Sequence, residues 1–491
     1  MRTKLFTLLF LVIFSVFNLY GEPTNYTYNY DFWGEQVASP DAYRVGAYIL
    51  GTTVGTTNFN SPQGLFIRDN FIYVCDTEND RIVIIEVLED GSHVLNNIYD
   101  SVVIDNELSR FSKPHDIFVN GDSSTIYMAD TGNNRVLILD GNWNFVHAIY
   151  KPEDDSLRNF EEDEDDLEEF TEFIPYKLVV DLANRVFVQA RNINKGLMEF
   201  SNRWEFSGFM GANKVNFNML DYIWKLLSTQ AQRSRMVLFI PTEYSNVAID
   251  KDGFIYVTNS TGQIDPVRRL NAMGQDILIR NGYVDPVGDL NAGSAANISG
   301  PSRFIDVVAF DNDSYACFDS NRGRIFLYDF QGNLLYAFGG RGNREGSFTN
   351  PVALDRMGSS LYALDSATSA ITRFDLTSYG YLINHALNEY RAGRYESSAD
   401  VWEEVLKMNG NYDLAYIGIG RAALRQGEYQ KAMRYYKLKH FREGYEKAFQ
   451  LYRKQWMEEN LWWLLIVLGA IIFVPSFVRF SIKVVKEIRE A

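Results

Sequence analysis

Six polar residues stand at the start of short apolar segments, and they are the first candidates for chemistry in this chain. They are Gln63, His115, Asp116, Tyr176, Ser245 and Arg303. Histidine and carboxylate side chains could hold a metal ion, but this set has one of each, and Asp306 adds only a second carboxylate. The other four histidines lie in outer or C-terminal segments, which excludes a zinc site of three histidines. His115 is therefore predicted to form hydrogen bonds, with metal binding as the alternative.

The highest local density of charge is an acidic run from Glu153 to Glu172, with the sequence EDDSLRNFEEDEDDLEEFTE. A calcium loop needs acids at defined positions around a glycine turn, and this run has neither a glycine nor a fixed spacing. We interpret it as a solvated loop, with weak binding of a divalent cation or a basic partner as the alternative. No metal or cofactor is predicted, calcium being the one alternative, and no serine nucleophile elbow occurs.

Composition excludes one class of partner. The formal net charge is −16, and a chain this acidic is repelled by phosphate backbones, so nucleic acid is not expected to bind. Aromatic residues make up 15% of the chain, which suits β-strands. The two cysteines, Cys75 and Cys317, lie inside apolar strand patterns and are predicted to be buried free thiols.

Two apolar segments predict a membrane topology. Residues 1–21 begin with Arg2 and Lys4 and continue into an apolar stretch, as in a signal peptide, with an uncleaved N-terminal anchor as the alternative. Residues 461–478 carry no charge and are long enough to cross a bilayer, with a buried core helix as the alternative. The tail 479–491 is basic. We therefore predict a single-pass protein of the cell membrane, with the bulk of the chain extracytoplasmic and a cytoplasmic C-terminus.

Internal repetition dominates the region between these segments. Residues 60–86 and 112–140 share a proline, an apolar strand, a tight turn, an IYV(M)xD segment, an Asn-x-Arg pattern and a further apolar strand. Weaker copies begin at Ile174, Ser245, Ile305 and Asn350. Six such units predict six small sheets, and radial packing of the sheets would bury the faces that a single sheet leaves open.

The recurrent Pro, YVxD and Asn-x-Arg pattern resembles NHL repeats, which implies a six-bladed β-propeller over residues 40–376. Three pairs are in register, and a fourth unit keeps only the Asp: Asp76 with Arg81, Asp130 with Arg135, Asp319 with Arg324, and Asp365. Gln189 and Asn259 are expected at the Asp position of units three and four. These residues are predicted to be structural, the Asp capping its own hairpin turn and the Arg packing along a neighbouring blade. The resemblance also brings Gln63, His115, Asp116, Tyr176, Ser245 and Arg303 to one mouth of the central channel.

The chain ends carry a signal for ring closure. The sixth unit lacks a fourth strand, whereas the segment from Tyr43 looks like a fourth strand with no preceding three. We therefore expect the N-terminal strand to complete the sixth blade, so that both ends of the propeller segment close the ring.

The pattern becomes helical after residue 379. Two segments align at an offset of 34 residues, with Gly393 matching Gly427 and Tyr395 matching Tyr429. This period resembles tetratricopeptide repeats over residues 379–456, which implies either partner binding or a spacer.

The leading hypothesis for function is a membrane-anchored extracytoplasmic binding scaffold of bacterial type. Its propeller and helices would engage a protein partner, a small molecule or a glycan, as an accessory of a transport or envelope complex. The alternative is a lactonase-like propeller hydrolase or lyase with a metal in the central channel. The sequence favours binding over catalysis.

Overall fold

The computed structural model describes residues 27–154, 157, 172–211, 243–259, 265–290 and 300–490. The predicted signal peptide and most of the acidic run lie outside these residues. The chain divides into two compact units, Met1–Tyr381 and Leu382–Ala491. Cys75 and Cys317 are buried and free, as predicted.

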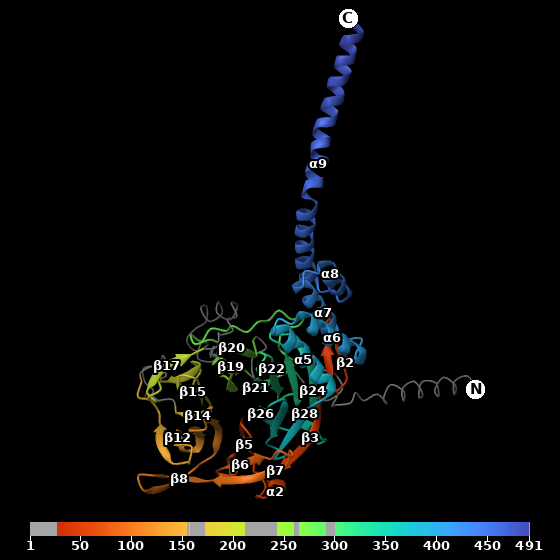
Figure 1. Cartoon of the computed structure of the whole chain (residues 1–491). Helices are drawn as coiled ribbons and strands as arrows, with labels where there is room; N and C mark the ends of the chain where they lie inside the picture. Colours follow the sequence, from red (N-terminus) through yellow and green to blue (C-terminus); the bar gives the residue numbers. More distant parts are fainter. Residues whose placement is uncertain are drawn as a thin grey trace, which may run out of the picture. The chain divides into compact units, whose positions relative to one another are not determined.

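Six inner strands form a closed ring in the first unit. Each strand contacts the next one, and the last contacts the first. The sheets that begin with them surround a common centre (Figure 1), which confirms the predicted β-propeller. The inner strands are β4 (Gly64–Arg68), β10 (Pro114–Val119), β14 (Ile174–Val180), β18 (Asn246–Ile249), β21 (Phe304–Ala309) and β26 (Pro351–Met357).

The other strands of each sheet follow outward in chain order. The first three sheets add β5 (Phe71–Asp76), β6 (Arg81–Val87) and β7 (His93–Tyr99); β11 (Thr125–Asp130), β12 (Arg135–Asp140) and β13 (Phe145–Ile149); and β15 (Val186–Arg191), β16 (Leu197–Phe200) and β17 (Phe206–Met210). The last three add β19 (Ile255–Thr258) and β20 (Val267–Leu270); β22 (Tyr315–Asp319), β23 (Arg324–Tyr328) and β24 (Leu334–Arg341); and β27 (Ser360–Asp365) and β28 (Ala370–Leu376).

The middle strands are apolar along their whole length because neighbouring sheets cover both of their faces. Every residue of β22 is buried, as is nearly every residue of β5 and β11. Such strands appear in the sequence as continuous apolar runs, whereas half-exposed outer strands such as β7 are mixed in polarity.

Strand β3 (Tyr43–Leu50) closes the ring. It pairs antiparallel with β28, from Leu50 opposite Ala370 to Tyr43 opposite Leu376, and so supplies the missing fourth strand of the last sheet. Figure 1 shows β3, near the red end of the colour bar, beside the teal β28. The predicted closure by the two chain ends is confirmed.

The described N-terminal part of the propeller begins earlier than residue 40. Strand β1 (Tyr28–Tyr30) pairs with β24, and β2 (Gln36–Ala38) pairs with β1, so the fifth sheet gains two outer strands. The hydroxyl groups of Tyr28 and Tyr30 donate to the buried carboxylate of Asp289 at 2.9 and 2.6 Å. The start of the chain therefore joins two neighbouring sheets.

A short hairpin and two smaller elements complete the first unit. The hairpin consists of β8 (Ser101–Ile104) and β9 (Glu107–Arg110) and lies between the first two sheets in the chain. Helix α2 (Gly51–Val54) follows β3, and β25 (Ser347–Phe348) pairs with β24.

Five helices follow the propeller strands. They are α5 (Ser378–Arg391), α6 (Tyr395–Met408), α7 (Asp413–Arg425), α8 (Tyr429–Leu438) and α9 (Arg442–Glu490). Helices α6 and α8 begin 34 residues apart, as the offset predicts, after turns in which Gly393 and Gly427 have φ values of 78° and 82°. A Cβ atom on Gly418 would lie 2.2 Å from the Trp402 ring, so this helix crossing requires a glycine.

Helix α9 contains a segment that is long and apolar enough to cross a membrane. The apolar side chains of this segment are exposed; Trp462 is 77% and Phe473 is 72% accessible. A buried core helix, the alternative interpretation of residues 461–478, is therefore not what the structure has. The helix continues through Pro475 to Glu490.

Candidate functional site in the central channel

The centre of the ring holds a cavity of about 680 Å³. Its walls come from all six inner strands and from the turns that follow them, so every sheet contributes. Side chains alternate along a strand, and every second residue of an inner strand therefore faces the channel. A volume of this size is in the range of small-molecule sites.

Four polar residues stand at the level of the cavity lining that is farthest along the inner strands from the turns, and we call this level the floor. They are Asp116, Lys177, Asn246 and Asp306, from four consecutive sheets. In three of these inner strands the floor residue directly follows a β-bulge, at His115, Tyr176 and Ile305. The bulges therefore give these three side chains a common register.

The floor residues bind one another across sheet boundaries. The ammonium of Lys177 lies 3.6 Å from a carboxylate oxygen of Asp116 and donates to the backbone carbonyl of Gln63 at 3.5 Å. The side-chain amide of Asn246 donates to Asp306. Asp116 also accepts the backbone N–H of Leu178 at 2.8 Å.

Buried and half-buried carboxylates accept hydrogen bonds from the unpaired edge of the inner ring. Asp306 accepts the backbone N–H of Leu354 at 2.6 Å, and Asp355 accepts that of Ile67 at 2.6 Å. In each case, as with Asp116, the carboxylate belongs to one sheet and the N–H to the inner strand of the next. An innermost strand has no partner on its channel side, so these N–H groups would otherwise lack acceptors.

Burial changes the protonation of this site. It raises the pKa of Asp306 and of Asp355 to about 7, and it raises the pKa of Asp116 as well. Burial lowers the pKa of Lys177, but the negative charges of Asp116 and Asp306 outweigh it, and the net pKa is raised. The cavity therefore combines a stable ammonium with two carboxyl groups that exchange protons near neutral pH.

Four of the residues predicted to meet at a channel mouth occupy equivalent positions. Each stands at the start of an inner strand, one residue before the position that a floor residue holds in the ladder. They are Gln63, His115, Tyr176 and Ser245. His115 and Tyr176 are in contact, with ring centroids 4.1 Å apart. Ser245 bonds instead to Thr258, at 2.8 Å, and to the carbonyl of Phe304, at 2.9 Å.

His115 is a neutral, buried imidazole. Its Nδ1 is buried and has no hydrogen-bond partner within the described residues. Burial, with the positive charges of Lys177, Arg191 and Lys113, lowers its pKa to about 3. Arg191 lies over the Tyr176 ring at 4.2 Å, and the cavity lining includes neither these two residues nor His115.

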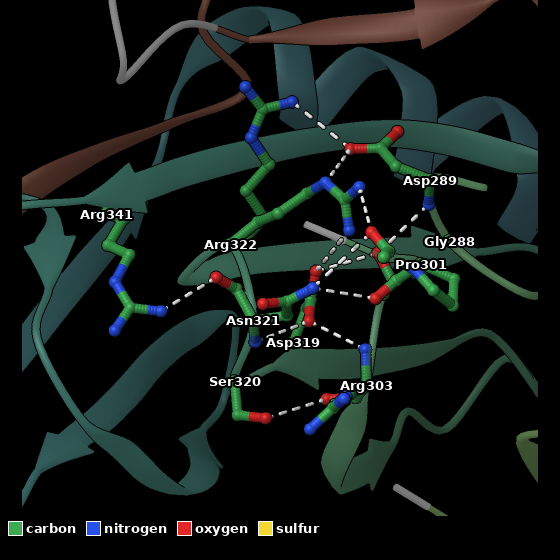
Figure 2. A network of polar contacts seen from close by, with 12 residues as sticks. Gly288, Asp289, Pro301, Arg303, Asp319, Ser320, Asn321, Arg322 and Arg341 are labelled. Carbon is green, nitrogen blue, oxygen red and sulfur yellow. Dashed lines mark hydrogen bonds and ion pairs between the residues drawn. The ribbon is translucent and has the colours of Figure 1, made fainter. Parts of the chain in front are cut away.

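Arg303 does not share the position of His115. The register places Ile305 there, because the bulge in β21 falls between Phe304 and Asp306. Figure 2 shows the backbone of Arg303 bound by its neighbours: its N–H donates to Asp319 at 2.8 Å, and its carbonyl accepts from Ser320 at 3.2 Å.

Each repeated Asp binds the link that precedes its own sheet, in addition to any contact with its own turn. Asp76 accepts the N–H of Asn60, in the link that precedes its own sheet, at 2.7 Å, and Asp130 and Asp319 accept equivalent N–H groups. Asp365 binds the N–H of Asn350 in its link and also the N–H groups of its own turn. The link is thereby fixed to the hairpin of the same sheet.

Two of the three repeated Arg residues bind within their own sheet and do not pack along a neighbouring blade as predicted. Arg81 and Arg135 pair with the Asp of their own sheet, each at 2.7 Å. Arg324 is opposite Asp319 in the ladder, but its guanidinium lies 3.5 Å from Asp289 and over the Tyr28 ring. In the third sheet, the residue opposite Pro175 is Ala190, not the expected Gln189.

The cavity lining includes residues that the sequence did not predict as site residues. They are Lys177, Asn246, Asp355 and a group of acids at the mouth of the cavity. Five of the six turns that follow the inner strands carry an aspartate that lines the cavity: Asp69, Asp122, Asp181, Asp250 and Asp311. Comparing the six units turn by turn could have found these acids. Among the described residues, no group of three or more His, Cys, Asp or Glu side chains is placed to hold a metal ion.

The comparisons with known proteins agree with a propeller. Residues 301–414, which include the fifth and sixth inner strands and reach the start of α7, match the family DUF5128, described as a 6-bladed beta-propeller. No curated protein matches the chain.

Similar solved structures include three of low identity. Virginiamycin B lyase from Staphylococcus aureus is 9% identical, with 68% of this chain and 100% of that chain covered and a TM-score of 0.39. A structural genomics protein of unknown function from Bacteroides thetaiotaomicron is 12% identical, with coverage of 70% and 80% and a TM-score of 0.42. Kuenenia stuttgartiensis hydrazine synthase is 11% identical, with coverage of 68% and 99% and a TM-score of 0.39. At these TM-scores, none of these structures supports a conclusion about function.

Proposed function

We propose that this protein is a membrane-anchored binding scaffold that holds a propeller, with its channel cavity, outside the cytoplasm. The observation that carries the proposal is the exposed apolar segment of α9 in the same chain as a propeller with an open polar cavity. Isolated apolar side chains are common on soluble proteins, but a continuous apolar helix surface of this length needs a membrane or a partner to cover it.

The charge pattern around α9 supports the orientation. Arg479 and Lys483 follow the apolar segment, and basic residues close to a span favour the cytoplasmic side. Trp462 and Trp463 stand at its other end, where indole rings favour the interface. The N-terminal basic and apolar sequence supports export of everything between the two segments.

The repeats support an interaction partner. The Asp76–Arg81 and Asp130–Arg135 pairs fit an NHL-like propeller, and the 34-residue offset of α6 and α8 fits tetratricopeptide-like helices. Both classes are interaction modules in bacterial proteins. We therefore infer that a protein of the envelope or of a transport complex is bound, while the cavity takes a smaller ligand.

An enzyme of the hydrolase or lyase class is the second candidate, and Asp355 is the observation that favours it. Its carboxyl group is part of the cavity lining, and a pKa of about 7 suits a general acid or base at neutral pH. Turnover of a compound that the cavity binds, lost on Asp355→Asn, would favour this candidate over the scaffold.

Membrane fractionation of cells that make the full chain tests the proposed function. We expect alkaline carbonate to leave the protein in the pellet and detergent to release it. Leu468→Arg with Ile471→Arg should shift it to the carbonate-soluble fraction, because charges at the centre of a span cost about 2.5–3.5 kcal/mol each. The matched control is Met408→Arg with Leu438→Arg, at exposed apolar positions at the ends of α6 and α8, which should leave the distribution unchanged.

Orientation is measured on the same cells. Protease added to intact cells from which any outer barrier has been removed should degrade the propeller and leave only the short tail. Extraction of the wild-type chain by carbonate, or full protection of the propeller from external protease, would overturn the proposal.

A further inference from the structure

We propose that the channel cavity binds a linear alkyl diamine or polyamine, whose ammonium groups meet the cavity carboxylates at successive levels. This inference rests on the proposed function and names the ligand class of the same site. It is argued from the charge balance of the lining, the spacing of its acids along the strands and the apolar walls beside them.

The lining has more acids than bases, and four of its aspartates have no ion pair within the described residues: Asp69, Asp122, Asp306 and Asp355. The other four are paired, Asp116 with Lys177, Asp181 with Arg185, Asp250 with Arg269 and Asp311 with Arg356. Eight of its side chains are aspartates and four are basic. The basic side chains are all engaged: Arg68 donates to the carbonyl of Val119, Arg356 to Asp311, Lys251 to the carbonyl of Asp311, and Lys177 to that of Gln63. An anionic ligand would find no free cation here, whereas a cation meets a surplus of acceptors.

The acids lie at three levels along the channel. Asp306 is at the floor, and Asp355 is at the level two residues further along the neighbouring inner strand. The exposed Asp69 and Asp122 stand in the turns where their strands end. A strand rises about 3.3 Å per residue, so the levels of Asp306 and Asp355 are about 6.6 Å apart. Four methylene groups separate two ammonium nitrogens by a comparable distance.

The carboxylate oxygens of Asp355 can accept further hydrogen bonds. The recorded donors to Asp355 are the N–H of Ile67 and the N–H of Arg356, one on each oxygen. Each oxygen of a carboxylate can accept two hydrogen bonds, so both retain a lone pair. At the mouth, Asp69 and Asp122 have no ion pair within the described residues, and they add an exposed acidic rim.

Apolar side chains make up the rest of the ring at the level of Asp355. Phe66 and Phe118 pack with ring centroids 5.1 Å apart at the level of Asp355, and Val179, Ala248 and Val308 complete that level of the lining. Methylene groups between two ammonium groups would contact these walls. A compact ion such as Na⁺ would gain nothing from them, so the walls favour an aliphatic chain.

Proton release gives the proposal a second readout. Asp306 and Asp355 are partly protonated near neutral pH, and a bound ammonium favours their charged form. Binding should therefore release protons, and affinity should rise with pH from about 6 to about 8. Ligands that bind elsewhere on the acidic surface would not show this dependence.

Calorimetry of the purified full-length protein in detergent tests the inference, with 1,4-diaminobutane and spermidine as probes. We expect saturable binding in two buffers of different ionisation heat, from which the released protons are counted. Butylamine, with one ammonium group, should bind at least about tenfold more weakly, and 1,4-butanediol should not bind.

Two variants and a control link binding to the cavity. Asp355→Asn should weaken diamine binding about tenfold and remove part of the proton release. Asp69→Asn with Asp122→Asn changes only exposed rim residues, so folding is safe, and binding should weaken about threefold with reduced salt dependence. Asp105→Asn, in the exposed β8–β9 turn, is the matched control and should change nothing.

Three outcomes would overturn the inference: no diamine binding, equal binding of butylamine and 1,4-diaminobutane, or binding that survives both cavity variants. Each leaves the membrane fractionation and protease results untouched, so failure of the ligand assignment is distinguishable from failure of the proposed function.

Discussion

Three aspartates of the inner ring have the same structural task, and it explains their unusual titration. Asp116, Asp306 and Asp355 each reach from one inner strand to a backbone N–H of the next. These contacts hold carboxyl groups in a poorly solvated place, and burial raises their pKa. The same residues thus join neighbouring sheets and give the cavity its sensitivity to pH.

Asp355 should make stability depend on pH in a defined direction. Its pKa rises on folding from the ordinary value of 3.8 to about 7, so its stabilising contribution is present in full below pH 3.8 and is lost as the pH rises through about 7. Between these values the free energy of unfolding should fall by about 1.4 kcal/mol per pH unit for this one group. Asp355→Asn should remove that slope, as measured by denaturant unfolding from about pH 4.5 to about pH 6.5.

Asp105→Asn serves as the control, since this residue lies in an exposed turn. An Asp355→Asn variant whose stability falls with pH as steeply as that of the wild type would contradict the assigned pKa.

At the scale of elements, two of the turns that follow the third strand of a sheet carry a tryptophan whose ring contacts the preceding sheet. One turn position has a positive φ throughout and is Gly91, Gly274 or Gly332 in three sheets, but Trp143 and Trp204 in two. Trp143 stacks on Tyr99 of the preceding sheet at 3.9 Å, and Trp204 stacks on His147 at 4.9 Å. The tryptophans accept an unfavourable backbone conformation because their rings contact the neighbouring outer strand.

Two substitutions at Trp143 should separate backbone strain from stacking. Trp143→Ala loses the stacking and keeps a side chain at φ 64°, whereas Trp143→Gly loses the stacking and relieves the strain. The alanine variant should therefore be less stable than the glycine variant by about 1 kcal/mol, which reverses the usual order of the two residues. A double-mutant cycle with Tyr99→Ala should give a coupling of about 1 kcal/mol by thermal unfolding. Equal stability of the two variants would argue against strain at this turn.

At the scale of the whole molecule, β3 makes the propeller one cooperative body. It belongs to the first part of the described chain and completes the last sheet, and every inner strand contacts two others around the ring. Opening one sheet therefore removes contacts from both neighbours. We expect damage at the closure to spread to the opposite sheets.

Ile49→Asp tests this expectation, because Ile49 is buried between β3 and its neighbours and the change places an unpaired charge there. Hydrogen exchange measured by mass spectrometry should show lost protection in β28 and also in the distant β15. Tyr48→Asp is the matched control on the same strand, since Tyr48 is 45% exposed, and it should leave both strands protected. Loss of protection confined to the last sheet would mean that the ring does not unfold as one body.

Much of this architecture could be predicted from the sequence because its signals are local or repeated. Apolar runs ended by turn residues located the strands, the missing fourth strand of the last unit indicated the closure by Tyr43–Leu50, and two glycines located the turns before α6 and α8. The long uncharged stretch indicated α9. The acidic turns were equally visible, yet only their common position around one cavity gives them a meaning.

The tertiary structure alone decided which polar groups meet. Asp116, Lys177, Asn246 and Asp306 come from four sheets far apart in the chain, and no local pattern relates them. A β-bulge shifts each of three inner strands by one residue, and such a shift moves side chains to the opposite face. This is why Ile305, and not Arg303, takes the position equivalent to His115. The contact of Arg324 with Asp289, at 3.5 Å, likewise joins segments that no local pattern relates. Strands form from contacts along the chain, but a channel site depends on a register that only the closed ring sets.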